Sequence, residues 1–215
     1  PQRYRKVNRR YQKALIMPAP RIRFYSPQEL ETFADAFLKK FHRPFDSLPV
    51  EIDTIVEADL DIRILPFSCL EQRYGLHGYL ALSLKKIYIE QYIMDEDNFE
   101  KRYRFTVAEE VAHLLLHKDL FKDVETPQEY LNTFDKITES EHTRMDMDAK
   151  RLAEAVLMPA EIFRRECLRL ITESKSRQVN TKPTLYSILA NKFNVSEDAI
   201  GYRFWHLGLY NQISL

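Results

Sequence analysis

The chain has 215 residues, a formal net charge of zero, 45% hydrophobic and 30% charged residues, and only two cysteines. Its length allows one domain with extensions and excludes two large independent domains, and no apolar run approaches the roughly 18 residues that span a bilayer, so we expect a soluble protein with no membrane partner. Because Cys69 and Cys167 lie far apart and outside any zinc-binding spacing, we expect two small core residues in a reducing, cytoplasmic compartment.

Residues 1–25 form a strongly basic segment. They contain eight Lys or Arg residues and no acid, so the rest of the chain holds 24 basic and 32 acidic residues, a formal charge of about −8. Tyr4 and Tyr11 lie among the basic residues, and this pattern suits nucleic acid through phosphate neutralisation and base stacking. The alternative is a solvated arm, or an arm that lies on the acidic body. If nucleic acid is a partner, we expect it to bind at this arm.

The first part of the body is predicted to alternate between short helices and strands. The segment SPQELETFADAFLKKF indicates a helix, because Ser26 can cap it, Pro27 fits its first turn and Glu29 completes a capping box. Pro49 opens a second, short helix in PVEIDTIVEA, and the alternation in DIRILPF predicts a strand. The segments GYLALSL and KIYIEQYI predict a hairpin that turns near Lys85. We expect a small sheet of three strands.

The second part of the body is predicted to be helical, because its apolar residues recur with the period of a helix and prolines punctuate the pattern. A proline stops a helix at the residue before it and fits the first turn of the next one. The expected helices cover about 97–120, a short surface segment from Thr126-Pro127, about 141–157, and the stretch after Met158-Pro159.

The polar tract SKSRQVNTKP at 174–183 is the best internal boundary, so we divide the chain into the arm, a core over 26–173 and an extension over 174–215. In the extension, LANKFNVSEDAIGYRFWHL predicts two short helices with Ser196 as the N-cap of the second, an arrangement like a helix-turn-helix. The second helix begins with acids and holds few basic residues. We therefore interpret the pair as structural cover and not as a DNA-binding element.

The stretch RFTVAEEVAHLLLH, Arg104 to His117, carries the candidate chemistry. Residues four apart on a helix lie about 40° from each other, so Glu109 and His113 project from the same side and both can reach one ion. In the zinc-binding pattern HExxH, two histidines hold the metal and the intervening glutamate is the general base; Glu109, Glu110 and His113 occupy these places here. The bare pattern EExxH is common on exposed helix faces, and by itself it leaves His113 as an ordinary histidine.

Two other ligand sets are open. His117 lies one turn beyond His113 and would form a two-histidine pair, but no glutamate stands at 114 to act as base, which favours a core or capping role for His117. His142 and Asp146 share the next predicted helix with i, i+4 spacing and would define a relocated site, which no known pattern supports.

Together, YRFTVAEEVAHLLLH and DMDAKRLAEAVLMP closely resemble the ImmA/IrrE family of zinc peptidase-like proteins. In that family an RFT-x-AHE-x-GH-LLLH helix precedes a helix that bears an acidic ligand and ends in LLMP, and the similarity extends loosely over residues 27–210. The resemblance implies an α+β fold with a zincin-like metallopeptidase core, a small and mostly antiparallel sheet, and a C-terminal helical, helix-turn-helix-like extension. It places the metal ligands on Glu109, His113 and Asp148, and the catalytic role on Glu110.

Two of these positions depart from the family's pattern, because Glu109 stands for a histidine and Asp148 for a glutamate. Carboxylate oxygen is an acceptable zinc ligand, so Zn²⁺ remains the expected cofactor. Two carboxylates and one histidine leave a divalent ion with no net charge, however, which should acidify its water less and shift the preference toward Mn²⁺ or Mg²⁺. Without a metal, the three acids would crowd one pocket and need a raised pKa or a basic partner. The candidate bases are Arg104, Arg144 and Arg151.

Two classes of function follow from this resemblance. An active protein would be a metal-dependent peptidase in which Glu110 takes a proton from water and returns it to the leaving amine. Its expected substrate would be a helix-turn-helix transcriptional repressor in a stress-response or mobile-element switch, and the strand KIYIEQY would offer an edge on which an extended substrate adds. The alternative is a catalytically impaired peptidase fold that binds and regulates a protein partner, or DNA, without cleavage.

Overall fold

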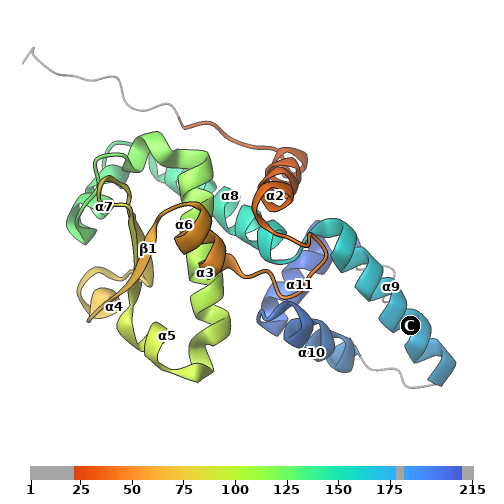
Figure 1. The fold of residues 1–215 in the computed structure, drawn as a ribbon. Coiled ribbons are helices and arrows are strands. Elements are labelled where there is room, and N and C mark those ends of the chain that lie inside the picture. Colours follow the sequence, from red (N-terminus) through yellow and green to blue (C-terminus); the bar gives the residue numbers. More distant parts are fainter. Residues whose placement is uncertain (1–21, 178–181, 210–215) are drawn as a thin grey trace, which may run out of the picture.

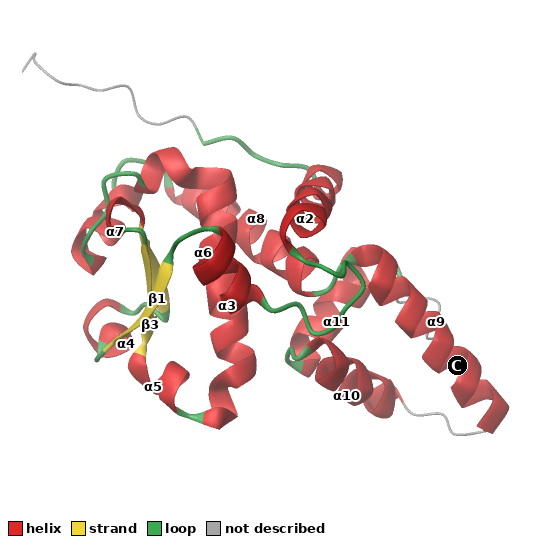
Figure 2. Ribbon diagram, viewed as in Figure 1, coloured by secondary structure: helices red, strands yellow, loops and turns green. Residues whose placement is uncertain are grey.

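A computed structural model describes residues 22–177 and 182–209. It has an α+β fold in which one small sheet lies beside long helices, with further helices at the other end of the molecule (Figure 2). Most of the basic arm lies outside the described residues, and so do four residues of the tract that we took as the internal boundary. The nucleic-acid role of the arm and the division of the chain into domains therefore stay predictions.

The sheet contains three strands in the order β1-β3-β2, namely β1 (Arg63–Phe67), β3 (Lys86–Glu90) and β2 (Gly78–Ala81). The hairpin prediction is confirmed, because β2 and β3 pair antiparallel. β1 pairs parallel with β3, however, so the sheet is mixed rather than mostly antiparallel. The prediction that the KIYIEQY strand forms an edge is wrong, since β3 lies in the centre, where Ile87 and Ile89 are completely buried. The edge strand on the hairpin side is β2.

Two long helices carry the core beside the sheet. Helix α6 (Glu100–Phe121) contacts β2 and packs against α8 (Glu139–Leu157), which crosses it (Figure 1). Thr138 caps α8 in a capping box with Glu141, which fixes where the helix begins. Met158-Pro159 ends it as predicted. Because α6 faces both α8 and the sheet, polar residues on its inner face are forced into a buried environment.

Three helix starts are confirmed at the residues that the sequence indicated, Ser26, Thr126 and Ser196. Ser26 and Glu29 form the capping box of α2 (Pro27–Phe41), and Thr126 caps α7 (Pro127–Phe134). The predicted second helix divides into α3 (Ile52–Thr54) and a π-helical turn, η1 (Ile55–Asp59). The remaining short elements are α4 (Leu70–Tyr74), the 3₁₀ turn η2 (Leu82–Leu84), α5 (Gln91–Asp95) and the 3₁₀ turn η3 (Asp97–Phe99).

The C-terminal helices are tied to the core through one buried arginine. Helix α9 (Ala160–Arg177) is followed by α10 (Lys182–Phe193) and α11 (Glu197–His206), and Ser196 caps α11 as predicted. Arg203 of α11 is 1% exposed and forms a bidentate ion pair with Glu31 of α2, at 2.5 and 2.8 Å, while its Nε donates to the Met158 carbonyl at 2.9 Å. α11 thus uses this arginine internally, which supports the interpretation of the pair as cover.

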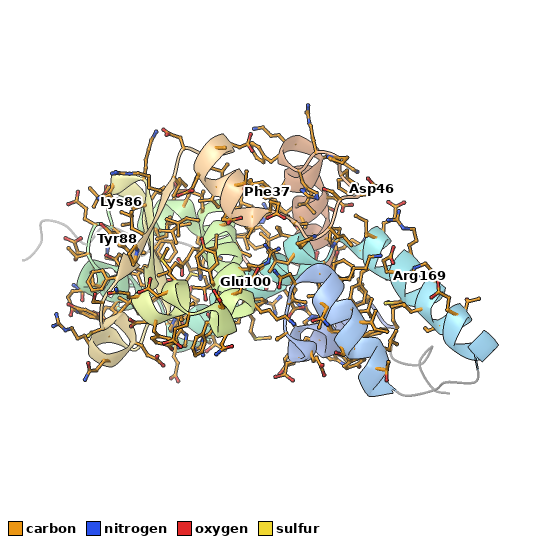
Figure 3. All side chains as sticks on the ribbon, turned by 60° about the horizontal axis from the view of Figure 1, so that its bottom comes forward. Phe37, Asp46, Lys86, Tyr88, Glu100 and Arg169 are labelled. Atoms are coloured by element: carbon orange, nitrogen blue, oxygen red, sulfur yellow. The ribbon has the colours of Figure 1, made fainter. Side chains whose placement is uncertain are left out.

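Side chains at the two ends of the molecule belong to different parts of the chain. Figure 3 places Lys86 and Tyr88 of β3 at one end and Arg169 of α9 at the other. The two long helices lie between these ends (Figure 1). In the described part of the chain, no helix combines the length and the hydropathy that a membrane-spanning segment needs.

Gly78 is required where β2 passes under α6. A Cβ atom at this position would lie 2.7 Å from Thr106 Cγ2 and 3.1 Å from the Tyr88 carbonyl oxygen. We expect Gly78→Ala to lower the free energy of unfolding by about 1–3 kcal/mol, because the backbone or α6 must shift to admit the methyl group. Urea denaturation measures this. The control is Gly201→Ala in α11, where the nearest atom would be 3.5 Å away and the change should be neutral or stabilising. Equal effects of the two substitutions would contradict the steric argument.

Candidate metal centre

Helices α6 and α8 bring three possible metal ligands together. Glu109 and His113 lie one turn apart on α6, and Asp146 comes from the facing side of α8. One donor atom from each lies within 4.8 Å of the other two. The structure therefore brings two of the predicted ligands together with a carboxylate from α8, the predicted helix, although this carboxylate belongs to Asp146 and not to Asp148.

Asp148, the predicted third ligand, is not part of this group. Its carboxylate accepts hydrogen bonds from the Tyr25 backbone N–H at 3.2 Å and from Arg144 Nε at 3.0 Å, and Arg144 also donates to the Tyr25 carbonyl at 2.9 Å. Residues two apart on a helix point about 200° from each other, so Asp146 and Asp148 cannot face the same spot. Asp148, which is 1% exposed, instead anchors the segment before α2.

Glu110 lies in the wall of the same cavity and is almost fully buried. One of its carboxylate oxygens accepts a hydrogen bond from the Leu80 backbone N–H of β2, whereas Oε2 has no hydrogen-bond partner. Burial, and to a smaller extent the neighbouring carboxylate of Glu109, raise the pKa of Glu110 well above its usual value. A buried carboxylate oxygen without a partner is uncommon in proteins, and this one lies beside three potential ligands.

His113 is held in one orientation by a second histidine. Its Nδ1 lies 3.2 Å from Nδ1 of His117, so one of the two rings donates to the other and Nε2 of His113 remains for an ion. Burial, and then the charges on Lys150 and His142, lower the pKa of His113 to about 3. The ring is therefore neutral and can offer a lone pair at physiological pH. His117 is thus a hydrogen-bond partner of the His113 ring.

Glu109 titrates near neutrality in this environment. Burial raises the pKa of Glu109 to about 7; the positive charge of Lys150 opposes the shift and Asp146 adds to it. Below that pH the carboxyl group carries a proton, which an ion has to displace.

We expect ion binding to depend steeply on pH for this reason. The dissociation constant for Zn²⁺ or Mn²⁺ should fall about tenfold for each pH unit up to about pH 7 and should level off above it, because one proton is then no longer released. Isothermal titration in two buffers of different ionisation enthalpy measures the proton count directly. Glu109→Gln should bind more weakly and lose the slope. A pH-independent affinity in the unsubstituted protein would contradict the assignment of Glu109 as a ligand.

The three possible ligands and Glu110 line a cavity of about 410 Å³ between α6, α7, α8 and the stretch before β2. Gly78 forms part of its wall, and the pKa of Tyr130, also in the wall, is raised well above its usual value by burial and by the nearby acids. Neither Tyr130 nor Lys150 was predicted from the sequence as part of the site. Other polar residues around the cavity are Tyr74, His77, Thr106 and His142.

A second, apolar groove of about 480 Å³ adjoins the cavity across Lys150, which lines both. It runs between α8 and α11, and three large side chains in its wall are more than half exposed. They are Met147 (53%), Tyr202 (61%) and Trp205 (65%). Exposed aromatic side chains beside a polar cavity are suited to contact with another polypeptide.

The residues present fit a divalent metal ion. One imidazole nitrogen and two carboxylate oxygens are acceptable ligands for zinc and favour manganese more than a two-histidine set would. Ligand atoms in a tetrahedral site lie about 3.4 Å apart, so the present separations need only small side-chain rotations. The unpartnered Glu110 oxygen and the neutral His113 ring agree with such a site.

Comparison with known proteins gives one result that bears on the site. The family model described as the IrrE N-terminal-like domain, an M78 peptidase family, matches residues 58–204, which is more than half of the chain. The matched region contains the sheet, α6, α8, α10 and most of α11, whereas α2 precedes it. No curated protein matches the chain.

Proposed function

We propose that this chain, which belongs to the IrrE N-terminal-like (ImmA/IrrE) family of metallopeptidase-like proteins, is a metal-dependent peptidase with its centre at Glu109, His113 and Asp146. The convergence of these three side chains within 4.8 Å, with Glu110 beside them, is the observation that carries the proposal. Zn²⁺ is the expected ion because of the family, and Mn²⁺ is the alternative because two of the three donors are carboxylates.

The protein's own residues have defined parts in hydrolysis. When bound, a divalent ion supplies a Lewis acid that polarises the carbonyl group under attack. We expect Glu110 to take a proton from the attacking water at Oε2 and to give it to the leaving amine; the proposal is supported by that oxygen being buried and unpartnered, on a residue that lines the cavity. The hydrogen bond from the Leu80 N–H holds the other oxygen and so fixes the direction in which the carboxylate points.

The surroundings of the centre are suited to a polypeptide substrate. The stretch that leads into β2, at the edge of the sheet, forms one wall of the cavity and offers a backbone along which an extended chain could lie. The groove with Met147, Tyr202 and Trp205 could accept an apolar side chain from the same substrate. We propose a helix-turn-helix transcriptional repressor as the substrate class, on the strength of the family resemblance.

A second function, regulation by binding without cleavage, is favoured by one observation. Lys150 Nζ lies 2.6 Å from Asp146 and 3.9 Å from Glu109, so both acids already have a cationic neighbour. A site whose charges are paired in this way can persist without a metal. The protein would then use the cavity and the groove to hold a partner.

Metal content and cleavage together decide between the two functions. Protein stripped with a chelator is reloaded with Zn²⁺ or Mn²⁺, analysed for bound metal, and incubated with a helix-turn-helix repressor and with an unfolded protein. The peptidase proposal expects about one metal per chain, loss of that metal in His113→Ala, and cleavage products that a chelator prevents. Binding of a repressor with neither metal nor cleavage would support the regulatory function and overturn the peptidase.

A further inference from the structure

Lys150 occupies an unusual place in the centre. It lies on α8 one turn after Asp146, and its Nζ contacts Asp146 Oδ2 at 2.6 Å and Glu109 Oε1 at 3.9 Å. These two oxygens belong to two of the three residues that would hold an ion. An ammonium group and a divalent ion would therefore compete for the same two carboxylates.

The formal charges show what Lys150 does to the centre. With both carboxylates ionised and His113 neutral, the three residues carry a charge of −2, and Lys150 beside them reduces the charge of the ion-free group to −1. A set of two histidines and one carboxylate carries the same charge of −1. In the ion-free protein, Lys150 therefore offsets the extra negative charge that Glu109 brings by standing in place of a histidine.

The lysine also has a place to which it can withdraw. Its side chain is about half exposed, and it lines the apolar groove as well as the cavity. The aliphatic stem can lie along the groove while the ammonium group remains in solvent. Movement of this one side chain would free both carboxylates without any change in the backbone of α8.

We propose that Lys150 is a resident counter-cation of the centre, which pairs with Asp146 and Glu109 when no ion is bound and must leave them for a divalent ion to bind. Lys150 thereby lowers the affinity of the site for metal and makes occupancy depend on metal concentration. This inference rests on the ligand set of the proposed function and adds regulation by metal supply.

The test is the metal affinity of Lys150→Met, which keeps the length of the side chain and removes its charge. Isothermal titration of chelator-stripped protein with Zn²⁺ and with Mn²⁺ should give dissociation constants about tenfold to a hundredfold lower than those of the unsubstituted protein. Lys150→Arg keeps the charge and should not tighten binding. Lys192→Met is the matched control, because Lys192 Nζ pairs with Glu166 at 2.5 Å between α9 and α10, outside the centre; it should leave the affinity unchanged.

The outcomes separate this inference from the peptidase proposal. If Lys150→Met binds no more tightly than the unsubstituted protein, or more weakly, the inference is overturned, whereas metal binding by the unsubstituted protein still stands for the peptidase. If only Lys150→Met binds metal, the inference is supported and the peptidase proposal fails. If neither protein binds metal, both fail. Thermal unfolding of each variant checks that the fold is intact.

Discussion

Glu110→Gln is expected to reduce peptide hydrolysis by about 10²–10⁴-fold while the bound metal stays at the level of the unsubstituted protein. Glutamine keeps the shape of the side chain and can still accept the hydrogen bond from the Leu80 N–H, but it cannot take a proton from water. Glu110 is not among the three residues whose donor atoms converge, so its replacement should not remove a ligand. Initial rates with the repressor substrate and elemental analysis of the same sample measure the two effects.

The same substitution should stabilise the ion-free protein. The pKa of Glu110 is raised far above its usual 4.5 in the folded state, so above about pH 4.5 the unfolded chain gives up this proton more readily than the folded one. The carboxyl group therefore destabilises the fold at neutral pH, and glutamine removes that penalty. We expect a higher unfolding temperature at pH 7.5 and little difference at pH 4. Glu161→Gln, at an exposed position of α9, is the control and should change neither rate nor stability. Cleavage that survives in Glu110→Gln would refute its role as the base.

Local signals in the sequence predicted most of the fold. Ser26, Thr126 and Ser196 each have a side-chain oxygen that satisfies a backbone N–H at the start of a helix, and all three helices begin there. The hairpin was predictable for a similar reason, since two alternating segments flank a short turn. The pairing of β1 with the other side of β3 was not predictable. Strand order depends on long-range pairing, which alternation within one segment does not encode.

The cluster of possible ligands contains two of the residues that the sequence suggested, and the difference at the third has a geometric cause. Spacing along one helix placed Glu109 and His113 together, since four residues make about one turn. The rotation of α8 about its own axis determines whether Asp146 or Asp148 faces α6. The family resemblance alone does not give this rotation. A usable signal was nevertheless present: Asp146 pairs with Lys150 and Asp148 with Arg144, each at i, i+4, so two ionic stripes run along different sides of α8.

The structure also shows which basic side chains pair with the acids of α6 and α8 in the ion-free protein. Of the three arginines that the sequence suggested, Arg144 pairs with Asp148, whereas Arg104 donates to the carbonyl groups of Val50 and Asn194. Lys150 is the base beside Glu109. The sequence does not distinguish Lys150, because a lysine among acids on a helix is an ordinary surface pattern. Only the position of Glu109 on the facing side of α6 gives this lysine a role.

Asp146→Asn and Asp148→Asn should change different properties of the protein, although the two residues lie only two positions apart on one helix. Asp146→Asn removes a charged donor from the centre and should weaken metal binding by at least about a hundredfold, with little change in stability, because Asp146 is partly exposed. Asp148→Asn should leave metal affinity within about threefold but lower the free energy of unfolding by about 1–3 kcal/mol, because it weakens the buried links to Arg144 and Tyr25. Isothermal titration and urea denaturation of both variants provide the four values. Loss of metal in Asp148→Asn with retention in Asp146→Asn would show that α8 presents its other side to α6, and the centre would then have to be rebuilt around Asp148.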